Sequence, residues 1–175
     1  MEGGIMYVST KRYGHEAGFS ICYRQHLADS HCKYLHGYSL AFEFEFESTT
    51  LDVRNWVCDF GGFKTLKYFL EDNFDHTLLV AASDPDYEDI VHLDNNTKGL
   101  GLAQVRIIEK TGCEGIAEFL FEYVNEIWLE ENGYKGQDRE VFCRRVRVFE
   151  TPCNSAMVEF TQYDWGRHKI LEKHT

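Results

Sequence analysis

The sequence lacks the features of a membrane, repeat or nucleic-acid-binding protein. No apolar run approaches the roughly 18 residues that a membrane-spanning helix needs, and no segment repeats. The first residues contain no cationic start followed by an apolar stretch, so we expect no signal peptide. Acidic residues outnumber basic ones, and the net charge of −11 argues against nucleic acid and anionic membranes as partners.

Paired cysteines are also missing. The chain has 6 cysteines but no C-x-x-C pair, which favours free thiols over a disulfide framework or a thiolate zinc site. Together with the absence of a targeting signal, this predicts a cytoplasmic protein. The length of 175 residues and the hydrophobic content of 43% fit one globular domain, residues 1–175.

The strongest periodic signal is a strand over residues 40–47. Its phenylalanines alternate with glutamates, which is typical of a strand with one buried and one charged face; these residues are Phe42, Glu43, Phe44, Glu45, Phe46 and Glu47. The segment of about residues 5–23 could pair with this strand as a hairpin, although Gly14 and Gly18 interrupt its pattern.

Two helices are predicted. Apolar residues at helical spacing over residues 63–74 indicate the first, which follows Gly61-Gly62. The second begins at Thr111, where Thr111 and Glu114 match a capping box, and its apolar stripe (Ile116, Leu120, Val124, Ile127, Trp128) runs to a stop at Gly133.

Two further strands are expected over residues 140–150 and 155–162, joined by a turn at Pro152. We interpret the acidic segment 83–101 as an irregular insertion loop. The resulting order of elements, β-β-α-α-β-β, is an α+β arrangement.

The first of these two strands ends in a carboxylate. Val146 and Val148 share a face with Glu150, whereas Arg145 and Arg147 point the other way. A carboxylate at the end of an apolar face is costly to bury unless something donates hydrogen bonds to it, or else the strand simply reaches solvent there. We expect the two arginines to pair with Glu43, Glu45 or Glu47 rather than to bind phosphate.

Reactive side chains concentrate in three short stretches: residues 31–38, Asp75-His76, and residues 150–153. An aspartate beside a histidine could orient the imidazole as an acid or base. Each stretch also has an ordinary structural reading. Cys32 could be a small buried hydrophobe, Asp75-His76 a polar helix end, and Glu150 a solvent-facing strand end.

In this order, however, the stretches resemble a known family. The chain is similar to the tetrahydropterin synthases of the tunnelling fold over about residues 19–160, on five motifs: Phe19-Ser20-Ile21-Cys22-Tyr23, Cys32-x3-His36-Gly37-Tyr38, Asp59-Phe60, Asp75-His76 and Glu150-Thr151. The resemblance implies a four-stranded antiparallel sheet with two helices on one face. It also implies a homotrimer or homohexamer with sites between subunits.

The resemblance further implies roles for individual residues. Cys32 would be the thiolate that removes a side-chain proton from the pterin, with Asp75 and His76 assisting the proton transfers. Glu150, followed by Thr151, would anchor the pterin ring. The C-x3-H spacing looks more like the 6-carboxytetrahydropterin branch, which acts on 7,8-dihydroneopterin triphosphate on the route to 7-deazaguanines such as queuosine.

The departure from the family concerns its cofactor. The family binds Zn²⁺ through three histidines, and at those positions this chain has Tyr23, His36 and Tyr38. A neutral phenol is a poor zinc ligand. Either the zinc is lost or the site is rebuilt, with His26 or His31 recruited beside His36.

The first functional hypothesis is therefore a lyase of the 6-carboxy or 6-pyruvoyl type. The second is a non-catalytic pterin- or purine-binding protein that keeps Glu150. A third is a related tunnelling-fold enzyme with different chemistry on a deazapurine or dihydroneopterin.

Overall fold

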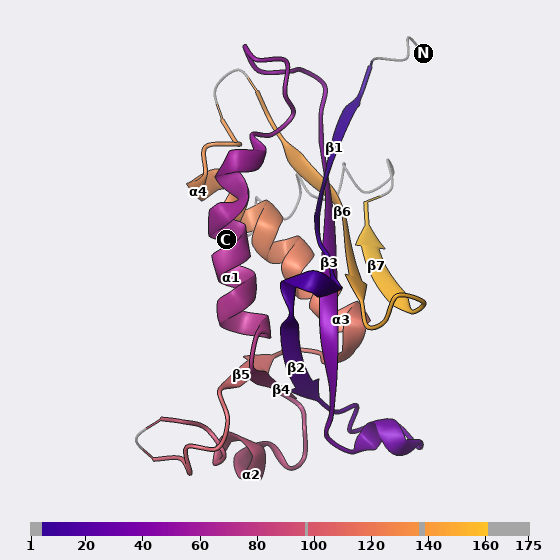
Figure 1. Ribbon diagram of the computed structural model, residues 1–175, viewed down its shortest axis with the longest axis vertical. Helices are drawn as coiled ribbons and strands as arrows, with labels where there is room; N and C mark the ends of the chain where they lie inside the picture. Colours follow the sequence, from indigo (N-terminus) through magenta and orange to yellow (C-terminus); the bar gives the residue numbers. More distant parts are fainter. Residues whose placement is uncertain (1–4, 97, 137–138, 161–175) are drawn as a thin grey trace.

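The structure, a computed structural model, describes residues 5–96, 98–136 and 139–160. Its centre is a seven-stranded sheet with helices α1 and α3 on the same side (Figure 1). The strands lie in the order β5-β4-β2-β3-β6-β7, and β1 also pairs with β3. Their bounds are β1 Tyr7–Tyr13, β2 Phe19–Tyr23, β3 His36–Ser48, β4 Thr77–Ala81, β5 Val105–Ile108, β6 Phe142–Phe149 and β7 Ser155–Glu159.

Strand β3 is long enough to pair with two strands along one edge. Its first part pairs with β2 and its second part with β1, both antiparallel. Between β1 and β2 the chain forms a short 3-10 helix, His15–Ala17, and leaves it through Gly18 at a φ of 78°. The expected hairpin partner is thus one strand broken in two, where the glycines interrupted its pattern.

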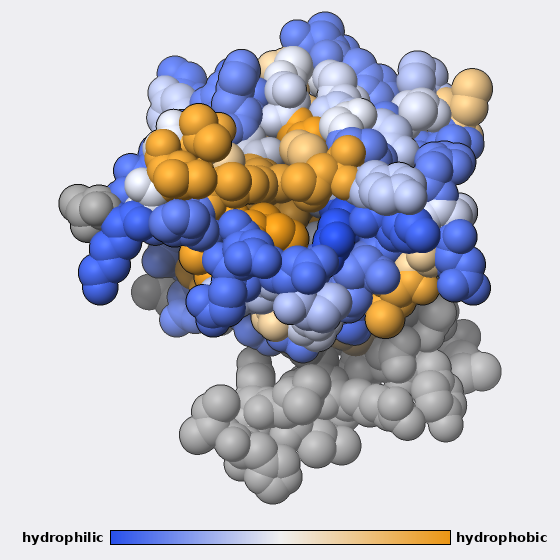
Figure 2. Space-filling model, turned by 90° about the horizontal axis from the view of Figure 1, so that it is seen from below, coloured by the Kyte–Doolittle hydropathy of each residue, from blue (hydrophilic) through white to orange (hydrophobic). Residues whose placement is uncertain are grey.

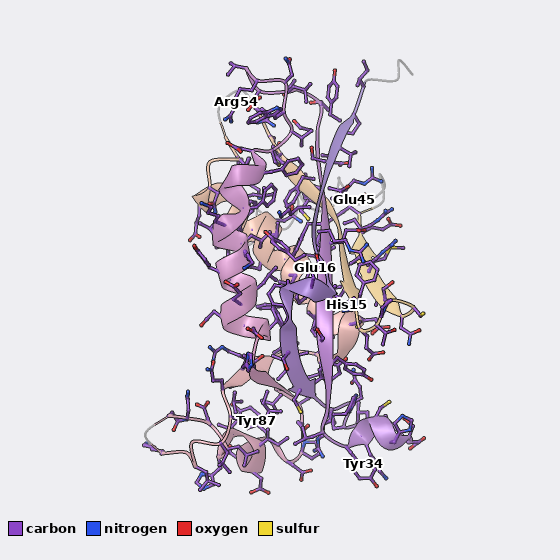
Figure 3. The ribbon with its side chains drawn as sticks, viewed as in Figure 1. His15, Glu16, Tyr34, Glu45, Arg54 and Tyr87 are labelled. Atoms are coloured by element: carbon purple, nitrogen blue, oxygen red, sulfur yellow. The ribbon has the colours of Figure 1, made fainter. Side chains whose placement is uncertain are left out.

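The predicted alternation along β3 is confirmed. Phe42, Phe44 and Phe46 are fully buried, and burial of each such side chain contributes about 1.5–3 kcal/mol. On the opposite face, which Figure 3 marks with Glu45, Arg145 contacts the Glu45 carboxylate at 2.8 Å.

The pairing of the second arginine is different from the expectation. Arg147 lies opposite Glu43 in register, but its guanidinium contacts the Met157 sulfur at 3.2 Å. A register shift between Glu45 and Phe46 brings Arg144 to 3.6 Å from Glu45 instead.

The two predicted helices are present. Helix α1 spans Lys64–Phe74 after a 3-10 turn, Phe60–Phe63. Helix α3 spans Gly112–Tyr123 and continues through a π turn, Val124–Trp128, and a short helix α4, Leu129–Glu131. Ile127, which we placed in the apolar stripe, is exposed.

The predicted capping box is wrong. The Thr111 side chain makes no cap hydrogen bond to the helix, and its hydroxyl donates instead to the Arg24 carbonyl at 2.8 Å. A tertiary contact has therefore replaced the local one.

The four-stranded antiparallel sheet is also wrong, because the segment between the helices adds two parallel strands. All five residues of β4 are buried; β4 pairs in parallel with β2, and β5 pairs in parallel with β4. A parallel strand covered on both faces, such as β4, has a largely apolar sequence without alternation, which is why the periodicity did not indicate it. The expected loop 83–101 also contains helix α2, Tyr87–Val91, whose Ile90 is buried.

The last predicted strand corresponds to β7, which ends at Glu159, and positions 161–162 lie outside the described residues. In the part of the chain that the structure describes, no helix is both long and apolar enough to cross a membrane.

Candidate active site

A cavity of about 270 Å³ opens where β2 ends, β3 begins, α3 begins and β6 turns into β7. We call it the Glu150 cavity. Its lining brings together four of the positions singled out in the sequence, Tyr23, Cys32, His36 and Glu150, and adds Gln25, Gly112, Cys113, Glu114, Asn154, Ser155 and Ala156. Tyr34, in the loop that carries Cys32, and Tyr87 of α2 lie at one end of the molecule, and Arg54 lies at the other (Figure 3).

Strand pairing gathers three aromatic rings beside this cavity, and two of them, those of Tyr23 and His36, line it. Tyr23 lies directly opposite His36, and Tyr38 is two residues further along β3 on the same face. The ring centroids of Tyr23 and His36 are 5.4 Å apart, those of Tyr23 and Tyr38 are 5.8 Å apart, and those of His36 and Tyr38 are 5.2 Å apart. We call these three residues the ring cluster.

The ring cluster contacts the carboxylate at the end of β6. The Tyr23 hydroxyl donates to Glu150 Oε1 at 3.3 Å. Burial, followed by the neighbouring Cys113 and Glu150, raises the pKa of Tyr23 well above its usual value. Burial and Glu150 likewise raise the pKa of Tyr38 to about 12. Both phenols therefore stay protonated at neutral pH and are available as hydrogen-bond donors.

Cys32 is held at the cavity by its own loop. It lies in a 3-10 helix, His31–Lys33, whose N-cap Ser30 accepts a hydrogen bond from the Cys32 backbone N–H. The Cys32 carbonyl accepts from the Gln25 N–H at 2.9 Å, which closes the base of the loop. Arg24, at the start of the loop, binds the buried Asp84 through two nitrogens, at 2.8 and 2.5 Å. Hydrogen bonds to both its N–H and its carbonyl thus hold the Cys32 backbone in place.

Sequence reasoning missed the contribution of the start of α3. Gln25 Nε2 donates to the Thr111 carbonyl at 2.8 Å, which links the β2 end to this helix. Gly112 has a φ of 90°, which favours glycine, and a Cβ there would lie 2.1 Å from Gln25 Nε2, so the Gln25 side chain would have to move. Burial raises the pKa of Cys113 to about 12, so this second thiol of the cavity stays protonated. The capping pattern predicted that a helix starts here, but it did not predict that the first residues of the helix line the cavity.

Asp75 and His76 lie elsewhere. His76 lines a separate hollow of about 450 Å³ on the other face of β2, beside Cys22 and β4; we call it the His76 hollow. Asp75 Oδ1 accepts from the Ser20 N–H at 3.1 Å and lies 2.8 Å from His76 Nδ1. The His76 side chain is 80% exposed, and its φ of 55° is a strained value for a residue other than glycine.

The surface at this end of the molecule mixes apolar and polar regions. Viewed from below, a band of hydrophobic side chains is bordered by hydrophilic ones (Figure 2). Leu35 and Leu102, which line the His76 hollow, are 45% and 73% exposed. Exposed apolar side chains therefore lie beside the Asp75–His76 pair.

Comparison with known proteins now identifies the family. The sequence profile named 6-pyruvoyl tetrahydropterin synthase matches residues 14–160. The chain belongs to this family. A 6-carboxy-5,6,7,8-tetrahydropterin synthase of Rickettsia bellii is 28% identical over 148 residues, which are 84% of this chain and 96% of that protein.

Two solved structures share the fold of this 6-pyruvoyl tetrahydropterin synthase family member. An uncharacterized protein of Wolinella succinogenes has a TM-score of 0.72 at 19% identity and covers 90% of this chain and 100% of its own. The 6-pyruvoyl tetrahydropterin synthase of Caenorhabditis elegans has a TM-score of 0.55 at 16% identity and covers 92% of this chain and 100% of its own. The resemblance seen in the motifs is confirmed.

The donors of the ring cluster do not fit the family's zinc site. His36 is its only imidazole, and His36 Nδ1 lies 2.6 Å from the Tyr34 carbonyl. His26 is 3.8 Å from Asp84, away from the cavity lining, and His31 is exposed. Within the described residues, no three His, Cys, Asp or Glu side chains are placed to hold a metal ion. What cofactor the family member uses stays a prediction.

Thr151 follows Glu150 but serves the turn. Its hydroxyl accepts hydrogen bonds from the backbone N–H groups of Cys153 and Asn154, at 3.2 and 3.0 Å. Among the described residues that line the Glu150 cavity it does not appear. Thr151 thereby shapes the β6–β7 turn that brings Asn154 to the cavity.

Proposed function

We propose that this family member is a lyase of the 6-carboxy- or 6-pyruvoyl-tetrahydropterin synthase type that acts on 7,8-dihydroneopterin triphosphate. The observation that carries the proposal is the Glu150 cavity, in which a half-buried thiol, Cys32, lies together with a carboxylate at the end of an apolar strand face. Those are the two groups that the reaction requires of one subunit: a base for a side-chain proton and an anchor for the ring.

In this proposal Glu150 binds the ring. One carboxylate oxygen already accepts from Tyr23, and the remaining acceptor sites match two parallel N–H donors, such as a ring N–H and an exocyclic amine. Cys32, as the thiolate, removes a proton from the ligand side chain and returns it later as the thiol.

The acid–base dyad comes from a second copy of the chain. In one chain Asp75 and His76 lie on the face of β2 opposite the Glu150 cavity, so they do not reach a ligand bound there. Within the described residues, β1, β5 and β7 each pair with a single neighbour, which leaves sheet edges for association. We propose a homotrimer or homohexamer with each site between subunits.

The phosphates also require a neighbouring copy. None of the described residues that line the Glu150 cavity is Lys or Arg, and two are glutamates. Cations that neutralise a triphosphate would therefore reach it from the adjacent subunit.

A second candidate function is a pterin- or purine-binding protein without turnover. The observation in its favour is the ring cluster, in which phenols stand at two of the family's ligand positions. This protein would keep the Glu150 anchor and lose the proton transfer.

The test incubates the purified oligomer with 7,8-dihydroneopterin triphosphate and identifies products by chromatography and mass spectrometry, beside equilibrium binding of neopterin measured by its fluorescence. The lyase predicts a 6-carboxy or 6-pyruvoyl product that disappears in Cys32→Ser. Neopterin binding that depends on Glu150 without turnover would establish the second candidate. Neither binding nor turnover would overturn both.

A further inference from the structure

The spacing within the ring cluster is informative in itself. Three imidazoles bound to one zinc at about 2.0–2.1 Å, with tetrahedral angles, have ring centroids about 5 Å apart. The three centroid separations here are 5.2, 5.4 and 5.8 Å. The strand register therefore holds three rings at separations close to those of a three-histidine site, although two of the rings are phenols.

The phenols have acquired a different partner. A tyrosine extends further from the backbone than a histidine, and the Tyr23 hydroxyl ends at the Glu150 carboxylate, 3.3 Å from Oε1. The Tyr23 side chain is only 2% exposed. Glu150 is partly buried, whereas the Tyr23 phenol is buried and needs an acceptor, which the Glu150 carboxylate provides.

From these contacts we propose that the ring cluster is a zinc site converted into a support for the ligand anchor: Tyr23 is a positioning residue that orients the Glu150 carboxylate, in place of a metal ion, and Tyr38 packs against the Tyr23 ring. The anchoring part rests on the proposed function, whereas the conversion of the site does not. The exchange makes ligand binding independent of divalent metal and sensitive to the phenol hydroxyls.

The conversion is tested by reversing it. Tyr23→His/Tyr38→His should bind about one zinc per chain by elemental analysis after dialysis, and adding His36→Ala to it should abolish that binding. The wild type and the matched double variant Tyr23→Phe/Tyr38→Phe should bind none. Stoichiometric, His36-dependent zinc in the wild type would overturn the proposal, and so would a folded double-histidine variant that takes up no zinc.

The supporting role is tested with neopterin as the probe. Removal of a hydrogen bond to a charged group should weaken neopterin binding by about 10-fold in Tyr23→Phe, with the value of kcat at saturation nearly unchanged. Tyr34→Phe is the control, because Tyr34 is exposed, lies in the loop that carries Cys32 and does not line the cavity. This variant should bind neopterin as the wild type does. Unaltered binding in Tyr23→Phe/Tyr38→Phe would overturn the supporting role. If the wild type itself binds no neopterin, the proposed function fails, while the zinc measurements still decide the conversion.

Discussion

The Glu150 cavity and the His76 hollow lie on opposite faces of the same short strand, yet they hold different kinds of groups. The cavity beside Tyr23 contains the Glu150 carboxylate, the Cys32 thiol and one buried phenol, that of Tyr23. The hollow beside Cys22 contains an exposed imidazole oriented by an aspartate on a strained turn. In the proposed function, the cavity holds the pterin ring and the hollow exchanges protons.

The physical reason for the separation is the period of a strand. Successive side chains point to opposite faces, so Cys22 and Tyr23 open onto different surfaces, and no adjustment of the loops joins them. A single chain therefore carries both halves of the proposed chemistry without combining them. In the proposed function, the complete site therefore combines the Glu150 cavity of one copy with the His76 hollow of another.

The largest effect is expected at the thiol. Cys32→Ser should lower turnover by about 10²–10⁴-fold, because a hydroxyl is a far weaker base than a thiolate, and it should leave neopterin binding within about twofold. Cys22→Ser, the neighbouring thiol on the other face of β2, is the matched control for steady-state kinetics. Equal losses in both variants would contradict the assignment of Cys32.

The next effect concerns the anchor. Glu150→Gln should weaken neopterin binding by about 10- to 100-fold, because the amide accepts less strongly and presents a donor to the ring N–H. Fluorescence titration measures the change. Glu159→Gln, which alters a carboxylate paired with Arg145 on the outer face of the sheet, should bind normally. If the two variants bind alike, Glu150 is not the anchor.

A smaller effect is expected at the start of α3. Gly112→Ala places a Cβ at a positive φ and against Gln25, which should cost about 1–3 kcal/mol of unfolding free energy and loosen the cavity wall. Gly133→Ala is the control: Gly133 also has a positive φ, 74°, but open space around it, so this variant shows the cost of backbone strain without a steric clash. Denaturant unfolding should show the larger loss for Gly112→Ala, and only that variant should bind neopterin less well.

The smallest effect is expected at the ion pair between Arg24, after β2, and Asp84, after β4. Hydrogen bonds from Arg24 lower the pKa of Asp84, on the segment behind the His76 hollow. A depressed folded pKa means that the pair stabilises the protein above the unfolded value of about 4, and that this contribution is lost as pH falls through the folded pKa. Asp84→Asn should lower stability at pH 7 and flatten the decline below pH 4 in urea unfolding; an unchanged acid limb would contradict this role of the ion pair.

The sequence predicted those parts of the fold and site that depend on local pattern. Alternation over residues 42–47 identified β3, and helical spacing identified α1 and α3. Cys32, His36 and Glu150, which the motifs singled out, line one cavity. Strand β4 was missed because a short, buried, largely apolar run has no period that distinguishes it, and β5 was missed because its four residues, which include Arg106, are too few to show one.

Other features depend on contacts between distant segments. The hydrogen bond from Thr111 to the Arg24 carbonyl replaced the expected cap. Gln25 and Asn154 line the same cavity although they belong to turns far apart in the chain. The placement of Asp75-His76 behind β2 followed from the parallel pairing of β4, which the sequence did not indicate. Such contacts have no signal in a single sequence.

The shared site is tested most directly by mixing two inactive variants. Cys32→Ser and His76→Asn, the latter chosen because asparagine tolerates a positive φ, are co-expressed with different tags and purified as mixed oligomers. If each site takes Cys32 from one copy and His76 from the next, random mixing leaves about a quarter of the sites intact. We predict about a quarter of wild-type turnover, against almost none for either variant alone. No recovery in the mixed oligomer would contradict a site built from two copies.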